Sequence, residues 1–142
     1  MSELPPRVMA LDWGTKRIGV AVSDPLGLMA HPVATLPAED EAALVRELKK
    51  IIEDKDVTRV IVGLPVNMDE THGPSAKAAK AFADRMAAAI ALPFETIDER
   101  LTSMDADARL HDAGLKDWKK RKQRIDRVAA ALILQSWLEK RR

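Results

Sequence analysis

The first third of the chain has the alternation of apolar and polar residues that predicts β-strands. Residues 8–12 form an apolar run ending in Asp12, which is typical of a strand covered on both faces. In residues 17–23, "RIGVAVS", large apolar side chains alternate with small ones. Only "WGTK" separates the two runs, so they predict an antiparallel hairpin. The small-residue face leaves room for a close neighbour, either a helix or a ligand.

The rest of the chain alternates between strand and helix patterns. A third short strand is expected within residues 29–36, where Pro32 favours an edge or a bulge. Apolar spacing, acidic first turns, alanine content and capping residues predict the later elements. These are a helix from about Glu39, a strand at 59–64, a helix from about Ser75 to Ile90, a strand at 93–98, a helix capped by Thr102 or Ser103 and ending before Gly114, and a last helix from about Gln123 to Glu139. This order predicts a single α/β domain over residues 1–142 with a mixed sheet.

Composition narrows the class of protein. The absence of cysteine excludes disulfides and thiolate sites, and it suits the reducing cytoplasm that we expect. No apolar run approaches the roughly 18 residues of a membrane span, and "MSELPPR" lacks the pattern of a signal peptide. The net charge is +1, so attraction to nucleic acid has to come from local patches.

Three acids stand out because they lie in three separate elements. Asp12 ends the first strand, Glu99 follows the fifth, and Asp126 begins the last predicted helix. Ligands of open α/β sheets collect at the carboxyl ends of strands, where all three acids fit. Carboxylates suit Mg²⁺ or Mn²⁺, and two such ions about 3.5–4 Å apart can support hydrolysis of a phosphodiester. Spacing alone leaves simpler roles open, namely a turn residue, a surface ion pair and a helix-dipole partner.

Four stretches of the chain resemble a known family. They are "LDWGTKRIGVAVSD", "VIVGLPVNMD", "IDERLTS" and "RIDRVAAALILQSWL". In this order they are similar to the pre-16S rRNA nucleases, a bacterial family also described as Holliday-junction-resolvase-like. The resemblance implies an RNase H-like fold with a five-stranded mixed sheet of order 3-2-1-4-5 and helices on both faces. It also implies a nuclease that depends on divalent metal, with Asp12, Glu99 and Asp126 as the catalytic metal ligands.

The chain departs from the pattern of these relatives at two places. Related resolvases carry an acid after the fourth strand, but "VGLP" has none, so the role is expected to pass to Glu99. Glu70 follows Asp69 where the family usually has glycine, and only glycine takes positive φ freely. Contributions from Asp69, Glu70 or Asp98 to the site stay open.

Positive charge is concentrated just before Asp126, in "KDWKKRKQR". We expect this run to neutralise phosphates and Trp118 to stack on a base, although such a run is often only a solvated loop. Gly14 leaves room for backbone amides to approach a phosphate. The residues predicted to contact nucleic acid are Lys16, Arg17, Asn67, Arg100, Thr102, Lys119, Lys120, Arg121, Lys122 and Arg124. The three histidines share no metal-ligand spacing.

Other functions are compatible with parts of this pattern. The expected substrate is the 5′ end of precursor 16S ribosomal RNA, cut by a monomer or weak homodimer; the alternative is a four-way DNA junction, where paired cuts require a symmetric dimer. An ATPase of the actin type would share the first phosphate loop, but the chain has no Gly-Gly pair and no visible second loop. A non-catalytic RNA-binding or transcription-associated module would retain the acids as relics.

Overall fold

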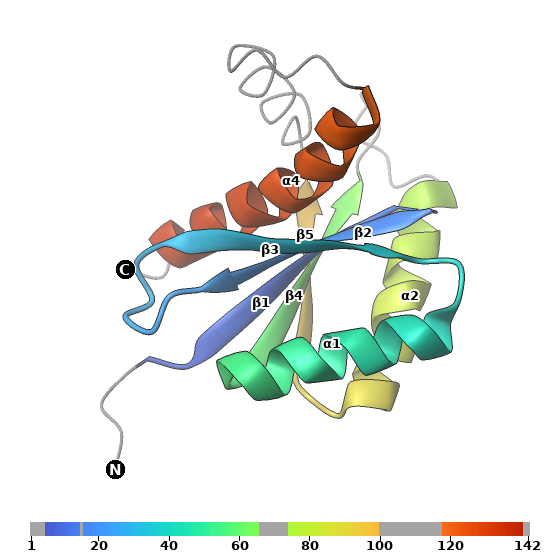
Figure 1. Cartoon of the computed structure of the whole chain (residues 1–142). Helices are drawn as coiled ribbons and strands as arrows, with labels where there is room; N and C mark the ends of the chain where they lie inside the picture. The colour runs from blue at the N-terminus through green and yellow to red at the C-terminus, as the bar shows by residue number, and fades with distance from the viewer. Residues whose placement is uncertain (1–4, 15, 66–73, 100–117, 141–142) are drawn as a thin grey trace.

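The predicted order of strands and helices is confirmed by a computed structural model, which describes residues 5–14, 16–65, 74–99 and 118–140 (Figure 1). Its strands are β1 (Arg7–Trp13), β2 (Arg17–Ser23), β3 (Ala30–Pro37), β4 (Val57–Pro65) and β5 (Phe94–Glu99). Its helices are α1 (Glu41–Lys55), α2 (Pro74–Ile90) and α4 (Trp118–Lys140). The helix predicted between Thr102 and Gly114 lies outside the described residues.

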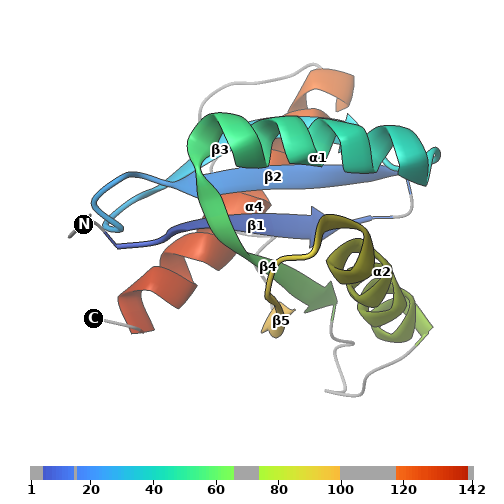
Figure 2. The ribbon, with the colours of Figure 1, turned by 90° about the horizontal axis from the view of Figure 1, so that it is seen from below.

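The five strands form one mixed sheet of order β3-β2-β1-β4-β5, as predicted. β2 pairs with β1 and β3 in antiparallel fashion, whereas β4 runs parallel to both β1 and β5. Pro32 lies on the edge strand β3 at a shift in register, which matches the edge or bulge expected for it. Helix α4 covers one face of the sheet, and α1 and α2 cover the other (Figures 1 and 2).

Alternation along β1 places its side chains in two separate cores. Met9 and Leu11 pack in the cluster beneath α1 and α2, which includes Leu48 and Phe82. Val8 and Ala10 belong to the cluster beneath α4, which includes Ile133 and Leu134. Asp12 continues the series of Val8 and Ala10, so the sheet presents it on the α4 face.

The last helix begins earlier than its apolar pattern indicated. It starts at Trp118 rather than near Gln123, and Asp126 therefore lies more than two turns inside α4 instead of in its first turn. Lysine, arginine and glutamine all have good helix propensity, so the basic run can extend the helix without apolar residues. The backbone of residues 118–124 is consequently helical, and the simple alternative of a solvated loop is wrong for this part of the run.

None of the helices in the described ranges combines the length and apolar character needed to cross a membrane.

Candidate functional site

The site is centred on Asp12, a carboxylate held almost completely inside the protein. Asp12 is 8% exposed, and it is one of two buried polar residues among those that the structure describes. Its neighbours across the ladder are Gly19 on β2 and Gly63 on β4. Asp12 is thus flanked on both adjacent strands by residues without side chains. No side chain from either neighbouring strand therefore projects beside the Asp12 carboxylate.

Gly19 is the point at which α4 approaches the sheet. A methyl group on Gly19 would lie 1.8 Å from the carbonyl oxygen of Asp126 and 2.9 Å from the amide nitrogen of Arg127. Such contacts are impossible, so only glycine permits α4 to lie this close. Since residues opposite one another in an antiparallel pair have Cα atoms about 5 Å apart, the contact brings Asp126 next to Asp12. The close neighbour expected on the small-residue face is helix α4.

The carboxylate of Asp126 is held by an arginine at the start of β2. Arg17 Nε donates a hydrogen bond of 2.8 Å to Asp126 Oδ2, across 109 positions of sequence. The two side chains are 29% and 21% exposed, so water screens this ion pair less than it screens a surface pair. Asp126 lies more than two turns from the start of α4, so the simpler role of a helix-dipole partner is wrong, and an ion pair with Arg17 takes its place.

The third predicted acid reaches the same edge of the sheet through β5. Glu99 is the last residue of β5 and pairs with Pro65 on β4, two positions beyond the pairing of Ile97 with Gly63. Because β1, β4 and β5 are parallel, Asp12 and Glu99 both lie at the carboxyl ends of their strands. The backbone therefore brings the positions of all three acids to one edge of the sheet. The side chain of Glu99 lies outside the description.

The carboxylate oxygens of the two described acids are ligands that a hard divalent cation prefers. Asp12 and Asp126 offer only carboxylate oxygens, which suit Mg²⁺ or Mn²⁺. Among described side chains, no three acids or histidines form a complete metal-binding group. Glu99, the third predicted ligand, is described in its backbone alone.

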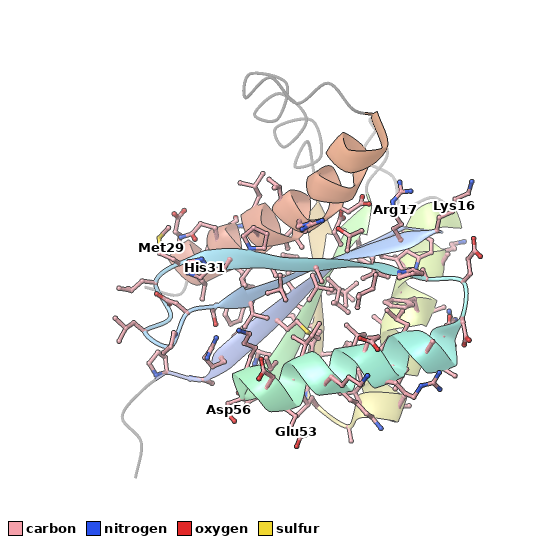
Figure 3. The ribbon with its side chains drawn as sticks, viewed as in Figure 1. Lys16, Arg17, Met29, His31, Glu53 and Asp56 are labelled. Carbon is pink, nitrogen blue, oxygen red and sulfur yellow. The ribbon has the colours of Figure 1, made fainter. Side chains whose placement is uncertain are left out.

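Two residues predicted to contact nucleic acid, Lys16 and Arg17, lie at this same end of the molecule. Lys16 is exposed in the turn between β1 and β2, beside Arg17 (Figure 3). Met29 and His31 lie at the opposite end of the sheet in the same view. The other predicted contacts lie outside the described residues or have undescribed side chains: Asn67, Arg100, Thr102, Lys119, Lys120, Arg121, Lys122 and Arg124. Asp69, Glu70 and Asp98 share this status.

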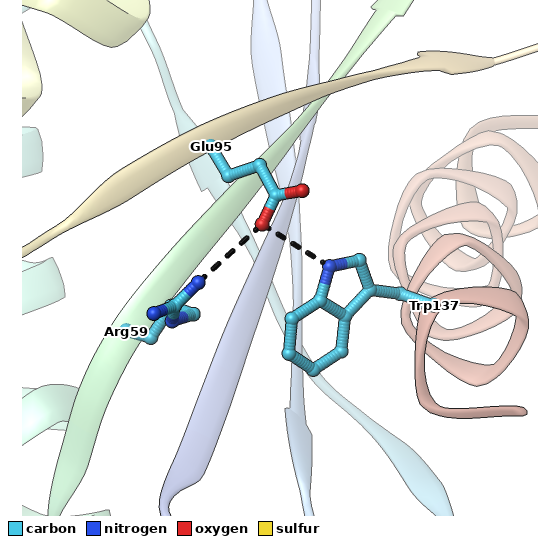
Figure 4. A network of polar contacts seen from close by, with 3 residues as sticks. All are labelled: Arg59, Glu95 and Trp137. Carbon is cyan, nitrogen blue, oxygen red and sulfur yellow. Dashed lines mark hydrogen bonds and ion pairs between the residues drawn. The ribbon is translucent and has the colours of Figure 1, made fainter. Parts of the chain in front are cut away.

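The far end of α4 is fixed by a different set of polar contacts. Glu95 on β5 lies 3.5 Å from Arg59 Nη1 and accepts a hydrogen bond of 3.3 Å from Trp137 Nε1 (Figure 4). Towards the other edge of the sheet, Gln135 accepts from the amide of Ala30 at 2.9 Å and donates to the carbonyl of Leu28 at 3.1 Å. Trp137 and Gln135 therefore attach the helix to both edges of the sheet.

Sequence reasoning did not find two features of the site, namely the glycine at position 63 and the pairing of Arg17 with Asp126. Gly63 lies in a strand whose apolar composition explained it fully. The partner of Arg17 is 109 positions away, and no local pattern identifies such a pair. A glycine within an apolar strand, aligned with an acid on the neighbouring strand, was the available signal for Gly63.

Comparison with known proteins gives consistent matches over the chain. The family model described as "RuvX: Holliday junction resolvase" matches residues 6–140. A protein of Anaeromyxobacter sp. (strain K), named "Putative pre-16S rRNA nuclease", is 44% identical over 135 residues, covering 95% of this chain and 98% of that protein. A relative of the same name from Roseiflexus sp. (strain RS-1) is 41% identical over 142 residues and covers both chains completely.

Among solved structures, the fold is similar to that of a resolvase bound to its substrate. The structure titled "T. thermophilus RuvC in complex with Holliday junction substrate" matches with a TM-score of 0.59 at 14% sequence identity, covering 96% of each chain. A second structure, titled "Thermus thermophilus RuvC structure", matches with a TM-score of 0.56. At this level of identity the likeness establishes the fold, which is RNase H-like as the sequence predicted.

Proposed function

This chain belongs to the RuvX family and is a nuclease, and we propose that it trims precursor 16S ribosomal RNA at the 5′ end with the help of divalent metal. The observation that carries the proposal is the convergence of Asp12 and Asp126 beside two glycines at the carboxyl edge of the sheet. Glu99 ends its strand at the same edge. The relatives at 41–44% identity carry the name of a pre-16S rRNA nuclease.

Asp12, Glu99 and Asp126 would hold Mg²⁺ or Mn²⁺. When bound, such ions supply neutralisation of the scissile phosphate and activation of the attacking water. The chain's own part is to place the ligands. β1 keeps Asp12 rigid within the ladder, Gly19 admits the backbone of α4, and α4 carries Asp126 to the edge. A site built on strands and a long helix holds its geometry more firmly than one built on loops.

Cationic residues around this edge would bind the phosphates of the RNA. Lys16 lies in the β1–β2 turn, Arg17 begins β2, and the helical run at 118–124 leads directly to Asp126. Asn67, Arg100 and Thr102 come from the segments that follow β4 and β5. A single cut needs a single active site, so a monomer or a weak homodimer is sufficient for this reaction. The chain would act as one nuclease domain, in the cytoplasm.

The deciding experiment compares two substrates side by side. Purified protein is incubated with a 5′-extended 16S RNA fragment and with a four-way DNA junction, each in Mg²⁺ or Mn²⁺ and in chelator. We expect metal-dependent cleavage of the RNA and its loss in Asp12→Asn. Paired symmetric cuts in the junction by a dimer would favour the resolvase alternative instead. If the protein binds nucleic acid but cleaves neither substrate, the non-catalytic module is favoured.

The contribution of the basic run is tested separately by the salt dependence of binding. Replacing Lys119, Lys120, Arg121 and Lys122 with alanine removes cations beside the site. Each lost phosphate contact should reduce the slope of log K against log salt by about 0.7–0.9. Lys49→Ala/Lys50→Ala on α1 is the matched control, because these exposed lysines lie on the other face of the sheet. An unchanged slope in the quadruple variant would remove the run from the RNA interface.

A further inference from the structure

Arg17 forms an ion pair with Asp126, one of the acids that the proposed function assigns to metal binding. Its Nε–H group donates to Asp126 Oδ2 at 2.8 Å, and both side chains are partly open to solvent. We propose that Arg17 is an exchangeable counter-ion of the site. It neutralises Asp126 while no divalent cation is bound, and it transfers to a substrate phosphate when the divalent cation binds to Asp126. The inference rests on the metal dependence proposed above and assigns a regulatory role to Arg17 within that site.

The chemistry of arginine suits such an exchange. The guanidinium group is permanently charged and presents its donors in a planar fork that fits a carboxylate and a phosphate equally well. Arg17 is the first residue of β2, directly after the exposed Lys16, so its side chain lies at the surface through which a nucleic acid would approach. A hydrogen bond that leaves Asp126 can therefore be replaced by one to the RNA.

Competition between Arg17 and the metal follows from electrostatics. A divalent cation and a guanidinium group on the same carboxylate repel each other, and this repulsion is stronger in a partly buried site than in water. Metal binding thus has to weaken the bond between Arg17 and Asp126. A phosphate that attracts Arg17 weakens the same bond. Metal and substrate then assist each other's binding, and this coupling is reciprocal.

Anchoring of α4 does not require this ion pair. The helix already buries Ala130, Ile133 and Leu134 against the sheet, and Gln135 and Trp137 attach its far end. The pair at the near end is therefore available to open without loss of the helix. A purely structural role for Arg17 is the alternative that the experiment has to exclude.

The first measurement is the affinity for Mn²⁺ by titration calorimetry without nucleic acid. Arg17→Met should bind Mn²⁺ about tenfold more tightly than the wild type, within the usual range of couplings, whereas Arg17→Lys should fall between the two. Arg59→Met is the matched control, because Arg59 pairs with Glu95 at the far end of α4, and it should match the wild type. Equal or weaker binding by Arg17→Met would overturn the exchange.

The second measurement follows the Nε–Hε groups of arginine by NMR in the wild-type protein, so it does not depend on the folding of any variant. In chelator the Arg17 proton should be protected from exchange with water, and Mg²⁺ should remove the protection. Arg85 provides an internal control, because its Nε donates to Glu41 Oε1 at 2.9 Å on the other face of the sheet. Its signal should stay unchanged.

The two results separate failure of this inference from failure of the proposed function. If the wild type binds the metal while the bond between Arg17 and Asp126 persists, the exchange is wrong and metal dependence stands. If neither the wild type nor Arg17→Met binds Mn²⁺ at millimolar concentration, both the metal dependence and the exchange are wrong. Binding that appears only in Arg17→Met would support the exchange in its strongest form.

Discussion

The two ends of α4 meet the sheet through contacts of opposite character. At the far end, Trp137 and Arg59 converge on Glu95, whose side chain is 40% exposed. At the near end, the acids are much less exposed, with Asp12 at 8% and the side chain of Asp126 at 21%, and the helix backbone lies against a glycine. About 16 Å of helix separates Asp126 from Trp137. Position is secured at the far end, which allows the near end to hold charged groups close together.

The largest expected difference between the two ends is in catalysis. Asp12→Asn and Asp126→Asn should each lower cleavage by about two orders of magnitude or more, because each removes a charge that stabilises the transition state by several kcal/mol. The two effects should not add in the double variant, since both act through one metal site. Glu95→Gln at the far end should retain activity within about twofold, a change well below 1 kcal/mol. Rates under single-turnover conditions provide the comparison, and an active Asp12→Asn protein would contradict the shared site.

A methyl group at Gly19 should separate α4 from the sheet at the near end. Because its carbon would lie 1.8 Å from the Asp126 carbonyl oxygen, Gly19→Ala should cost about 1–3 kcal/mol of unfolding free energy and should also reduce cleavage. Gly27→Ala is the control: Gly27 has φ of 69°, so alanine there is strained by about 1–2 kcal/mol, yet the position lies far from the acids. Urea unfolding and cleavage are measured on both variants. Full activity in Gly19→Ala would show that the close approach is dispensable.

Stability without metal should also distinguish the two ends. In chelator, Asp126→Asn should unfold more easily by about 1–2 kcal/mol, because Arg17 loses a charged acceptor. If the three acids instead repelled one another in the absence of metal, Asp126→Asn would be as stable as the wild type or more stable. Glu95→Gln should cost about 0.5 kcal/mol or less, since that ion pair is well exposed. Mg²⁺ should then stabilise the wild type more than Asp126→Asn. Thermal melts in chelator and in millimolar Mg²⁺ test both statements, and a more stable Asp126→Asn protein would show that repulsion among the acids outweighs the ion pair with Arg17.

The smallest effect concerns an exposed arginine–carboxylate pair on the other face of the sheet. The hydrogen bonds from Arg85 keep the pKa of the Glu41 carboxyl below its ordinary value of 4.5. A lowered pKa contributes stability that is complete above pH 4.5 and is lost as pH falls through the folded-state pKa. Glu41→Gln should therefore reduce stability by about a few tenths of a kcal/mol at pH 7 and by nothing measurable near pH 2. Urea titrations at the two pH values measure the unfolding free energy of both proteins. An equal loss of stability in Glu41→Gln at both pH values would refute this assignment.

The succession of strands and helices was predictable because its signals are local, whereas the strand order followed from the family resemblance. The short "WGTK" connection predicted the hairpin, alternation in "RIGVAVS" predicted a close neighbour on the small-residue face, and Pro32 indicated the irregularity in β3. The start of α4 was not predictable in the same way, since residues 118–124 have the propensity of a helix without an apolar face. Apolar spacing reports burial, and these seven residues precede the segment that the sheet buries.

The candidate site was predictable only in part. Asp12, Glu99 and Asp126 were identified from strand ends and from family resemblance, and the backbone brings their positions to one edge. The bond between Arg17 and Asp126 depends on the crossing of α4 over β2, which no spacing in the sequence encodes. Long-range pairs of this kind arise from tertiary packing, so they become visible only when the elements are assembled.

The order in which these elements are synthesised has a consequence for when the enzyme becomes active. α4 follows every other described element along the chain, yet its partners at the near end, Asp12, Arg17 and Gly19, lie within the first hairpin. Contacts of such high sequence separation form late in folding, and chains emerge from the ribosome with their N-terminal elements first. A nascent chain can complete its hairpin while its third acid is still unmade. The positions of Asp12 and Asp126 are therefore brought together only in molecules whose synthesis has passed the start of α4.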